Sequence, residues 1–178
     1  AGYTKDHPVE RLYRDNRLNP IHEGAHAIHG IDILGRKVRM GDGAAMDILE
    51  KELEKTVEEA KSLSGLDDEV IAFSNAVERL FQTTAKVIAE GDPDRELANA
   101  TLFLDAFGHI MIAWMWLRQG VALKSSGEKY DSSYIIGKLR AMKYFYAYEL
   151  PRVNLWLDIV GRMEMVCADM EPEEFLTA

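Results

Sequence analysis

Apolar residues recur every three or four positions along most of this chain, and glycine or proline interrupts the pattern only at a few points. The first long stretch carries Met46, Leu49, Leu53, Val57, Ala60 and Leu63. One face of an α-helix has this spacing, whereas a half-buried β-strand alternates at every second residue. No alternating stretch competes with it. The pattern therefore predicts an all-α fold.

Breakers divide residues 41–170 into four such stretches. They run from Gly43 to Ser64-Gly65, from Asp67 to Gly91, from Pro93 to Ser125, and onward from Ser132. Pro151 lies inside the fourth stretch, where it removes one backbone hydrogen bond and is expected to bend the helix. Long helices with short connections favour an up-down four-helix bundle.

The first 40 residues differ from the rest. A short helix is expected after Asp6-His7-Pro8 and ends at Asn19-Pro20, and a second one runs from Glu23 or Gly24 to Met40. Neither short helix buries much apolar surface alone, so this part needs a covering surface. We expect a four-helix bundle preceded by two shorter helices.

Charge and composition exclude some classes of function. The chain has 30 Asp and Glu against 21 Lys and Arg, a net charge of −9, which is the wrong sign for binding nucleic acid. Its single cysteine, Cys167, permits no internal disulfide and suits a reducing compartment, so we expect a cytoplasmic protein. The most apolar stretch, Leu97 to Leu117, is interrupted by Asn99, Asp105 and His109, which predicts a buried helix and no membrane span.

A zinc motif is the most conspicuous short pattern. His22-Glu23-Gly24-Ala25-His26 matches H-E-x-x-H, in which two histidines on one helix face bind zinc and the glutamate activates water. Pro20 and Gly24 disfavour the necessary helix, and beyond His29 no third ligand is evident. A zinc hydrolase is therefore a minor alternative, and we expect no metal. No second E-x-x-H follows Glu23-x-x-His26, which excludes a di-iron bundle site.

A longer pattern surrounds this motif. The stretch Gly2-Tyr3-Thr4-Lys5-Asp6-His7-Pro8-Val9-Glu10-Arg11-Leu12-Tyr13-Arg14-Asp15-Asn16-Arg17, followed by Ile21-His22-Glu23-Gly24, closely resembles the C-terminal helical region of the acyl-CoA dehydrogenases. The remaining helices, with Gly35-Arg36-Lys37-Val38, are similar to the additional C-terminal helical domain of a subgroup that includes methylthiopropanoyl-CoA-type dehydrogenases. The resemblance implies that residues 1–40 end the dehydrogenase's helical domain, that 41–178 form the additional domain, and that the chain is a fragment.

The resemblance also implies a chemistry. Glu23 occupies the place of the general base in the FAD-dependent α,β-dehydrogenation of an acyl-CoA thioester, and Gly24 that of the glycine that lets substrate approach the backbone. The segment Ala25, His26 and Ala27 stands where the family contacts FAD, although Ala25 replaces the usual threonine and His29 the usual glutamine. Spacing alone favours a different role for Glu23, an ordinary first-turn glutamate stabilised by the helix dipole.

The same resemblance implies an acyl-CoA substrate, an acceptor such as an electron-transfer flavoprotein, and a homo-oligomer. The isolated fragment is expected to be inactive, because the family builds its site largely from domains that are absent here. A non-enzymatic helical assembly module is the main alternative, since it requires only a bundle with an exposed apolar face. Asp105 and His109, four residues apart, are expected to form a mutually satisfied buried pair.

Overall fold

The computed structural model describes residues 4–19, 22 and 25–175, and within them every regular element is a helix. The predicted all-α fold is confirmed. The α-helices are α1 (Val9–Arg17), α2 (His26–Gly35), α3 (Ala44–Lys61), α4 (Asp67–Ile88), α5 (Pro93–Leu97), α6 (Ala100–Lys124), α7 (Ser132–Tyr144) and α8 (Arg152–Arg162). Short 3₁₀ turns are η1 (Lys37–Arg39), η2 (Gly127–Lys129) and η4 (Pro172–Phe175), and a π-helical segment, η3 (Phe145–Glu149), joins α7 to α8.

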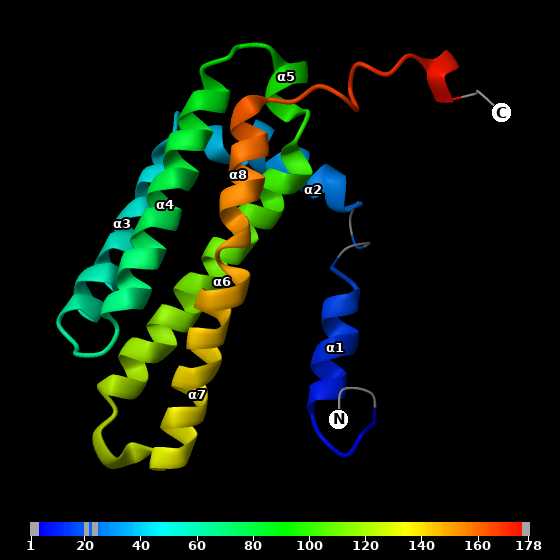
Figure 1. The fold of residues 1–178 in the computed structure, drawn as a ribbon. Coiled ribbons are helices and arrows are strands. Elements are labelled where there is room, and N and C mark those ends of the chain that lie inside the picture. Colours follow the sequence, from blue (N-terminus) through cyan, green and yellow to red (C-terminus); the bar gives the residue numbers. More distant parts are fainter. Residues whose placement is uncertain (1–3, 20–21, 23–24, 176–178) are drawn as a thin grey trace.

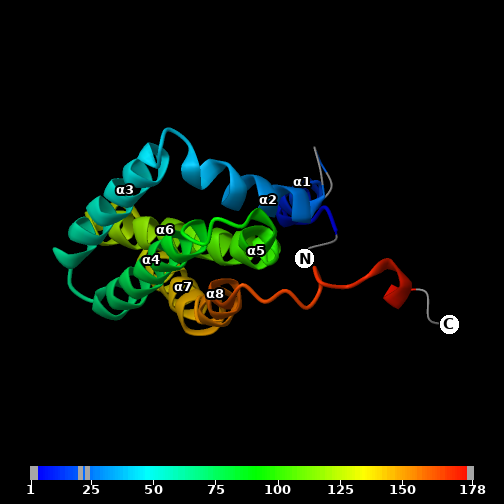
Figure 2. The same cartoon turned by 90° about the horizontal axis from the view of Figure 1, so that it is seen from above.

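Four long rods form the bundle, as expected: α3, α4, α6, and α7 continued by α8 (Figure 1). Helix α6 lies at the centre and contacts α2, α3, α4, α7 and α8. Seen from above, α2 runs along one side of α6, and α7 and α8 lie on the other side (Figure 2). The two expected shorter helices precede the bundle as α1 and α2.

Helix α6 supplies much of the core. Phe103, Ile110 and Leu117 on this helix are completely buried. By length and composition alone α6 could cross a membrane, and it is the one helix in the described part of the chain that meets this test. Its contacts with five other helices place it at the centre of the bundle.

The fourth rod is distorted where Pro151 was expected to bend it. The change begins before the proline, because the π-helical segment η3 precedes Leu150 and Pro151, and α8 begins only at Arg152. Proline lacks the N–H that would continue the helical ladder, and the wider π turn accommodates this loss. Tyr146 in this segment is buried and donates its hydroxyl to the Ala113 carbonyl of α6 at 3.0 Å. Burial, reinforced by the charge of Glu69, raises the pKa of this phenol, so it stays a donor.

The third predicted helix, Pro93 to Ser125, is interrupted. The short helix α5 ends at Leu97, and α6 begins at Ala100 after a non-helical Asn99 (φ −118°, ψ 28°). The amide group of Asn99 donates to the Glu164 carbonyl at 2.9 Å, a contact with residues beyond α8. The spacing of apolar residues in the sequence does not indicate this hydrogen bond, because it joins residues 65 positions apart.

Helix α2 begins and ends inside its expected range, and it packs closely against α6. A methyl group built on Gly30 would lie 2.6 Å from the backbone oxygen of Ala100. Glycine therefore permits the two backbones to approach at this point. Leu34, one turn further along α2, is buried in the same contact region.

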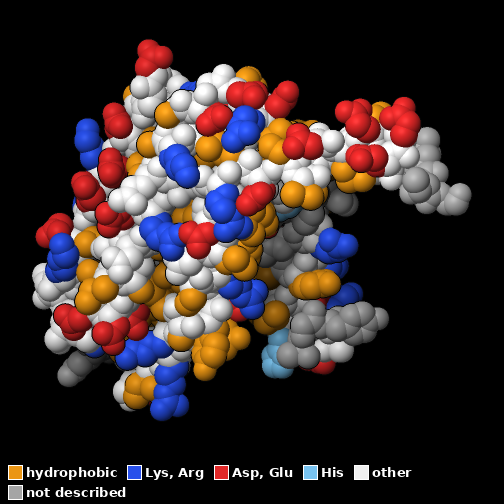
Figure 3. Space-filling view, turned by 45° about the horizontal axis from the view of Figure 1, so that its top comes forward, with side chains coloured by type: hydrophobic (Ala, Val, Ile, Leu, Met, Phe, Trp, Pro, Cys, Tyr) orange, Lys and Arg blue, Asp and Glu red, His pale blue; other side chains and the backbone are white. Residues whose placement is uncertain are grey.

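Helix α1 stands apart from the bundle (Figure 1). None of its residues is buried, and Val9, Leu12 and Tyr13 expose an apolar stripe at helical spacing. The chain beyond α8 likewise extends away from the bundle, and Figure 3 shows acidic side chains gathered on it. The covering surface that the sequence requires for α1 is not supplied by the described residues.

The Gly30 contact leads to the first prediction. Gly30→Ala should lower the free energy of unfolding by about 1–3 kcal/mol, because the methyl group meets backbone that cannot rotate away. Gly137→Ala, in α7 where an added methyl group meets nothing within 4 Å, should instead raise it by about 0.5–1 kcal/mol. Urea unfolding followed by circular dichroism measures both values. Equal stability of the two variants would contradict a close α2–α6 contact.

Candidate functional site

The site suggested by the sequence is centred on the beginning of α2. Ala25 is extended (φ −71°, ψ 158°), and its carbonyl accepts hydrogen bonds from the amides of Ile28 and His29 at 2.9 and 3.3 Å. No described side chain caps this helix. Ala25, His26 and Ala27 are exposed, so the first amides of α2 face outward at the positive end of the helix dipole.

A histidine–carboxylate contact connects this helix start to the bundle. Nε2 of His26 lies 3.0 Å from Oδ1 of Asp105, a residue 79 positions later on α6. The two side chains are 47% and 36% exposed, so water screens the pair and its contribution to stability is modest. It nevertheless anchors the first residue of α2 to α6.

A second histidine lies next to this pair. Nδ1 of His109 is 3.0 Å from the Asp105 carbonyl oxygen, which only accepts, so Nδ1 carries the proton. Nε2 of the same ring lies 3.9 Å from Glu149, which also pairs with Arg152 at 3.3 Å. The ring packs edge-on against Trp156 at 4.7 Å between ring centres.

His26, Asp105 and His109 border a hollow of about 730 Å³ between the N-terminal segment and α6. Its lining residues are Asn16, Asn19, His26, His29, Leu104, Asp105, Gly108, His109 and Ile112. Imidazole and carboxylate groups lie beside apolar side chains of α6, in a volume typical of small-molecule sites. The hollow has room for a ligand with both polar and apolar groups, or for side chains of another domain.

The expected buried pair of Asp105 and His109 is wrong in its partners. The Asp105 carboxylate contacts His26, and His109 reaches the backbone carbonyl of Asp105 in place of its carboxylate. Neither residue is fully buried. Successive turns of α6 aim the aspartate toward α2 and the histidine toward η3 and α8, which helical spacing alone does not distinguish.

The zinc alternative also fails on geometry. Because Ala25 is extended and α2 begins at His26, His22 and His26 do not lie one turn apart on a common helix. His26 is engaged by Asp105, and Nε2 of His29 lies 3.2 Å from the His22 carbonyl. Among the described residues, no three His, Cys, Asp or Glu side chains are grouped to hold a metal ion.

Two of the predicted site residues, Glu23 and Gly24, lie outside the described residues, and their roles stay predictions. The other three, Ala25, His26 and Ala27, form the exposed start of α2. Asp105 was not connected with this segment from the sequence. Its partner is 79 residues away, and no spacing pattern signals such a contact.

Comparison with known proteins identifies the family. The sequence model of the family described as acetyl-CoA dehydrogenase C-terminal like matches residues 49–171, which include α4 to α8 and most of α3. The chain belongs to this family. The resemblance to acyl-CoA dehydrogenases is thereby confirmed, and it extends to the helices of the bundle.

Curated relatives agree with this assignment. The chain is 31% identical over 121 residues to a 3-methylmercaptopropionyl-CoA dehydrogenase of Ruegeria pomeroyi, covering 64% of the chain and 20% of the relative. It is 21% identical over 187 residues to a broad-specificity linear acyl-CoA dehydrogenase of Mycobacterium tuberculosis, covering 98% and 31%. A 38-residue stretch is 50% identical to a cyclohexane-1-carbonyl-CoA dehydrogenase of Syntrophus aciditrophicus, covering 21% and 10%. The chain thus spans less than a third of each relative's length.

The anchoring of α2 gives the second prediction. A double-mutant cycle of His26→Ala and Asp105→Ala should show a coupling free energy of about 0.5 kcal/mol, the scale of a partly exposed polar pair. Asp105→Ala should also speed amide hydrogen exchange at Ile28 and His29, whose amides donate to the Ala25 carbonyl, because the helix start loses its anchor. Asp68→Ala, an exposed first-turn aspartate on α4, is the matched control and should leave these amides unchanged. Zero coupling with unchanged exchange would show that the pair anchors nothing.

Proposed function

We propose that this chain is the C-terminal part of an FAD-dependent acyl-CoA dehydrogenase, with Glu23 as the general base and Gly24 beside the substrate. The observation that carries the proposal is the similarity to an acyl-CoA dehydrogenase over 98% of the chain. The family model, which matches 49–171, supports it further. In this proposal residues 1–40 close the dehydrogenase domain and 41–178 form an additional helical domain.

The start of α2 fits the cofactor role. Ala25, His26 and Ala27 are exposed, and the helix has no side-chain cap among the described residues. Backbone amides in this position donate to polar or anionic groups without any movement of the helix. Ala25 lacks the hydroxyl of the usual threonine, but its replacement leaves these amides in place. We therefore assign FAD contacts to the backbone of this segment.

The proposed reaction divides the work between two groups. Glu23 takes the proton from the carbon next to the thioester carbonyl, and its carboxylate must lie within hydrogen-bond reach of that proton. FAD, when bound, accepts the hydride from the neighbouring carbon. Gly24 has no side chain to obstruct the thioester. The contact of His26 with Asp105 holds the residue three positions beyond the base against the bundle.

Other parts of the proposal concern partners. An acyl-CoA thioester is the substrate, and an electron acceptor such as an electron-transfer flavoprotein reoxidises the enzyme. The uncovered stripe of α1 supports packing against the rest of the enzyme or a further subunit in a homo-oligomer. Cytoplasmic location stays a prediction.

The third prediction concerns the full-length protein. Purified with flavin, it should show a flavin absorbance spectrum that bleaches when a saturated acyl-CoA thioester is added. Glu23→Gln should lower the bleaching rate at least about 100-fold, because a general base contributes on this scale, while flavin binding is retained. Glu52→Gln, an exposed glutamate on α3, is the control and should react as the wild type does.

The isolated chain provides the complementary measurement. It should turn over no acyl-CoA in the presence of an electron acceptor, because it spans at most 31% of the two relatives matched over most of its length. Turnover by this chain alone would contradict its assignment as a partial enzyme. If the flavin of full-length Glu23→Gln bleached at the wild-type rate, Glu23 would not be the general base.

The exposed stripe of α1 supports a second candidate function, a helical assembly module. In that case the 178-residue chain alone forms a defined oligomer, and this is the fourth prediction. Leu12→Glu, which places a charge in the stripe, should return the oligomer to monomers, because an apolar interface does not accommodate an unpaired carboxylate. Light scattering after size exclusion gives the mass. Glu59→Lys, an exposed charge change on α3, should leave the mass unchanged, and a monomeric wild type would contradict the module.

A further inference from the structure

A groove between α3 and α4 lies away from the proposed dehydrogenase site. It has a volume of about 550 Å³ and an apolar floor formed by Leu53, Val57, Phe73, Val77 and Phe81. Leu53 and Phe73 are buried in the core, whereas Val57, Val77 and Phe81 are only partly covered. The floor is therefore the outer edge of the bundle core, left open along two antiparallel helices.

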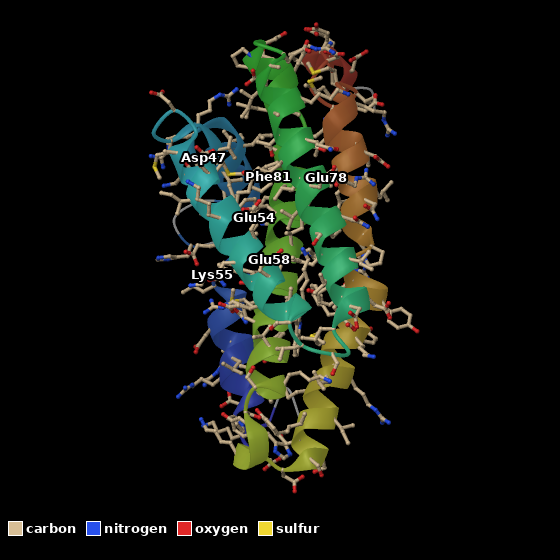
Figure 4. The ribbon with its side chains drawn as sticks, turned by 90° about the vertical axis from the view of Figure 1, so that its left-hand side faces the viewer. Asp47, Glu54, Lys55, Glu58, Glu78 and Phe81 are labelled. Carbon is tan, nitrogen blue, oxygen red and sulfur yellow. The ribbon has the colours of Figure 1, made fainter. Side chains whose placement is uncertain are left out.

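The rim of this groove is acidic. Glu50, Glu54 and Glu58 lie along α3, Glu78 lies on α4, and all four side chains belong to exposed residues. Lys61 is the one basic residue in the lining, and it is already paired with Glu58 at 2.7 Å. Figure 4 looks onto this face and labels Glu54 and Glu58 on α3, with Glu78 and Phe81 on α4. The groove thus combines an apolar floor with a net negative rim.

The shape of the groove indicates an elongated occupant. From Glu50 to Lys61 the α3 side of the lining extends about 16 Å at 1.5 Å per residue, which is three helical turns. A helix laid between α3 and α4 would insert one row of apolar side chains into the floor and place its flanking residues beside the carboxylates. The phosphates of a CoA thioester would be repelled by the same rim, which separates this groove from the proposed substrate site.

We propose that the α3–α4 groove is a docking site for a cationic amphipathic helix of a partner protein. Apolar residues at helical spacing fill the floor, and Lys or Arg beside them pair with Glu50, Glu54 and Glu78. Burial of the apolar row supplies most of the affinity, and the rim charges select the sign of the partner and steer its approach. The inference does not depend on the proposed dehydrogenase function.

Synthetic helices test this docking site, and this is the fifth prediction. The probe is a fluorescein-labelled peptide of about 15 residues with leucines on one face and lysines on the other, and its counterpart carries glutamate in place of every lysine. Fluorescence anisotropy with the 178-residue chain should show saturable one-to-one binding of the lysine peptide and none of the glutamate peptide. Glu50→Gln/Glu54→Gln should weaken binding about fivefold, the scale of two rim charges.

The matched control changes the same charge on the same helix. Glu52→Gln/Glu59→Gln alters two exposed α3 glutamates outside the lining and should bind the lysine peptide as the wild type does. Val77→Thr, which places a hydroxyl on the floor, should also weaken binding, and circular dichroism confirms that each variant is folded. Equal weakening by both glutamate pairs would mean attraction to the net charge only and would overturn the proposal. So would binding of both peptides, binding of neither, or a dimer of the chain that only the groove variants dissociate.

Discussion

Close backbone contact between α2 and α6 is the constraint on which the rest of the structure depends. Gly30 leaves no room for a side chain against the Ala100 backbone, so α2 lies this close to α6 only with glycine at this position. This contact carries the first part of the chain onto the central helix of the bundle. The contact of His26 with Asp105 then orients the first residue of α2 on the same helix. The close backbone contact at Gly30 thus places α2 on α6, and the solvent-screened contact of His26 with Asp105 adds a second point of attachment.

The bundle accommodates two interruptions without losing its core. Asn99 breaks the third rod and binds the Glu164 carbonyl, and Pro151 is preceded by a π-helical segment in the fourth rod. The buried side chains of α6, which begins just after Asn99, recur every three or four residues along the whole helix. The π segment also turns Tyr146 inward to the Ala113 carbonyl, so a backbone irregularity supplies a buried hydrogen bond. Each distortion is local because the packing on either side is continuous.

The molecule presents three surfaces of different chemistry. The hollow near His26 and His109 carries imidazole and carboxylate groups, the groove of α3 and α4 carries an apolar floor with an acidic rim, and α1 carries an uncovered apolar stripe. In the proposed dehydrogenase, the first and third of these surfaces would meet other parts of the enzyme. The acidic groove is set apart from these, because its charge is unsuited to an acyl-CoA thioester.

Helical periodicity, turn residues and a long family-like stretch determined the all-α class, the four rods and the family from the sequence alone. They did so because a helix face and a turn each depend on residues that are only a few positions apart in the sequence. Only the tertiary structure decided that Asp105 pairs with His26 and not with His109, that Asn99 divides the third rod, and that α3 and α4 leave a groove with carboxylates along its edge. These features join residues tens of positions apart, and rotation of each helix about its axis selects the partners. Sequence spacing defines a helix face, but only packing determines what that face meets.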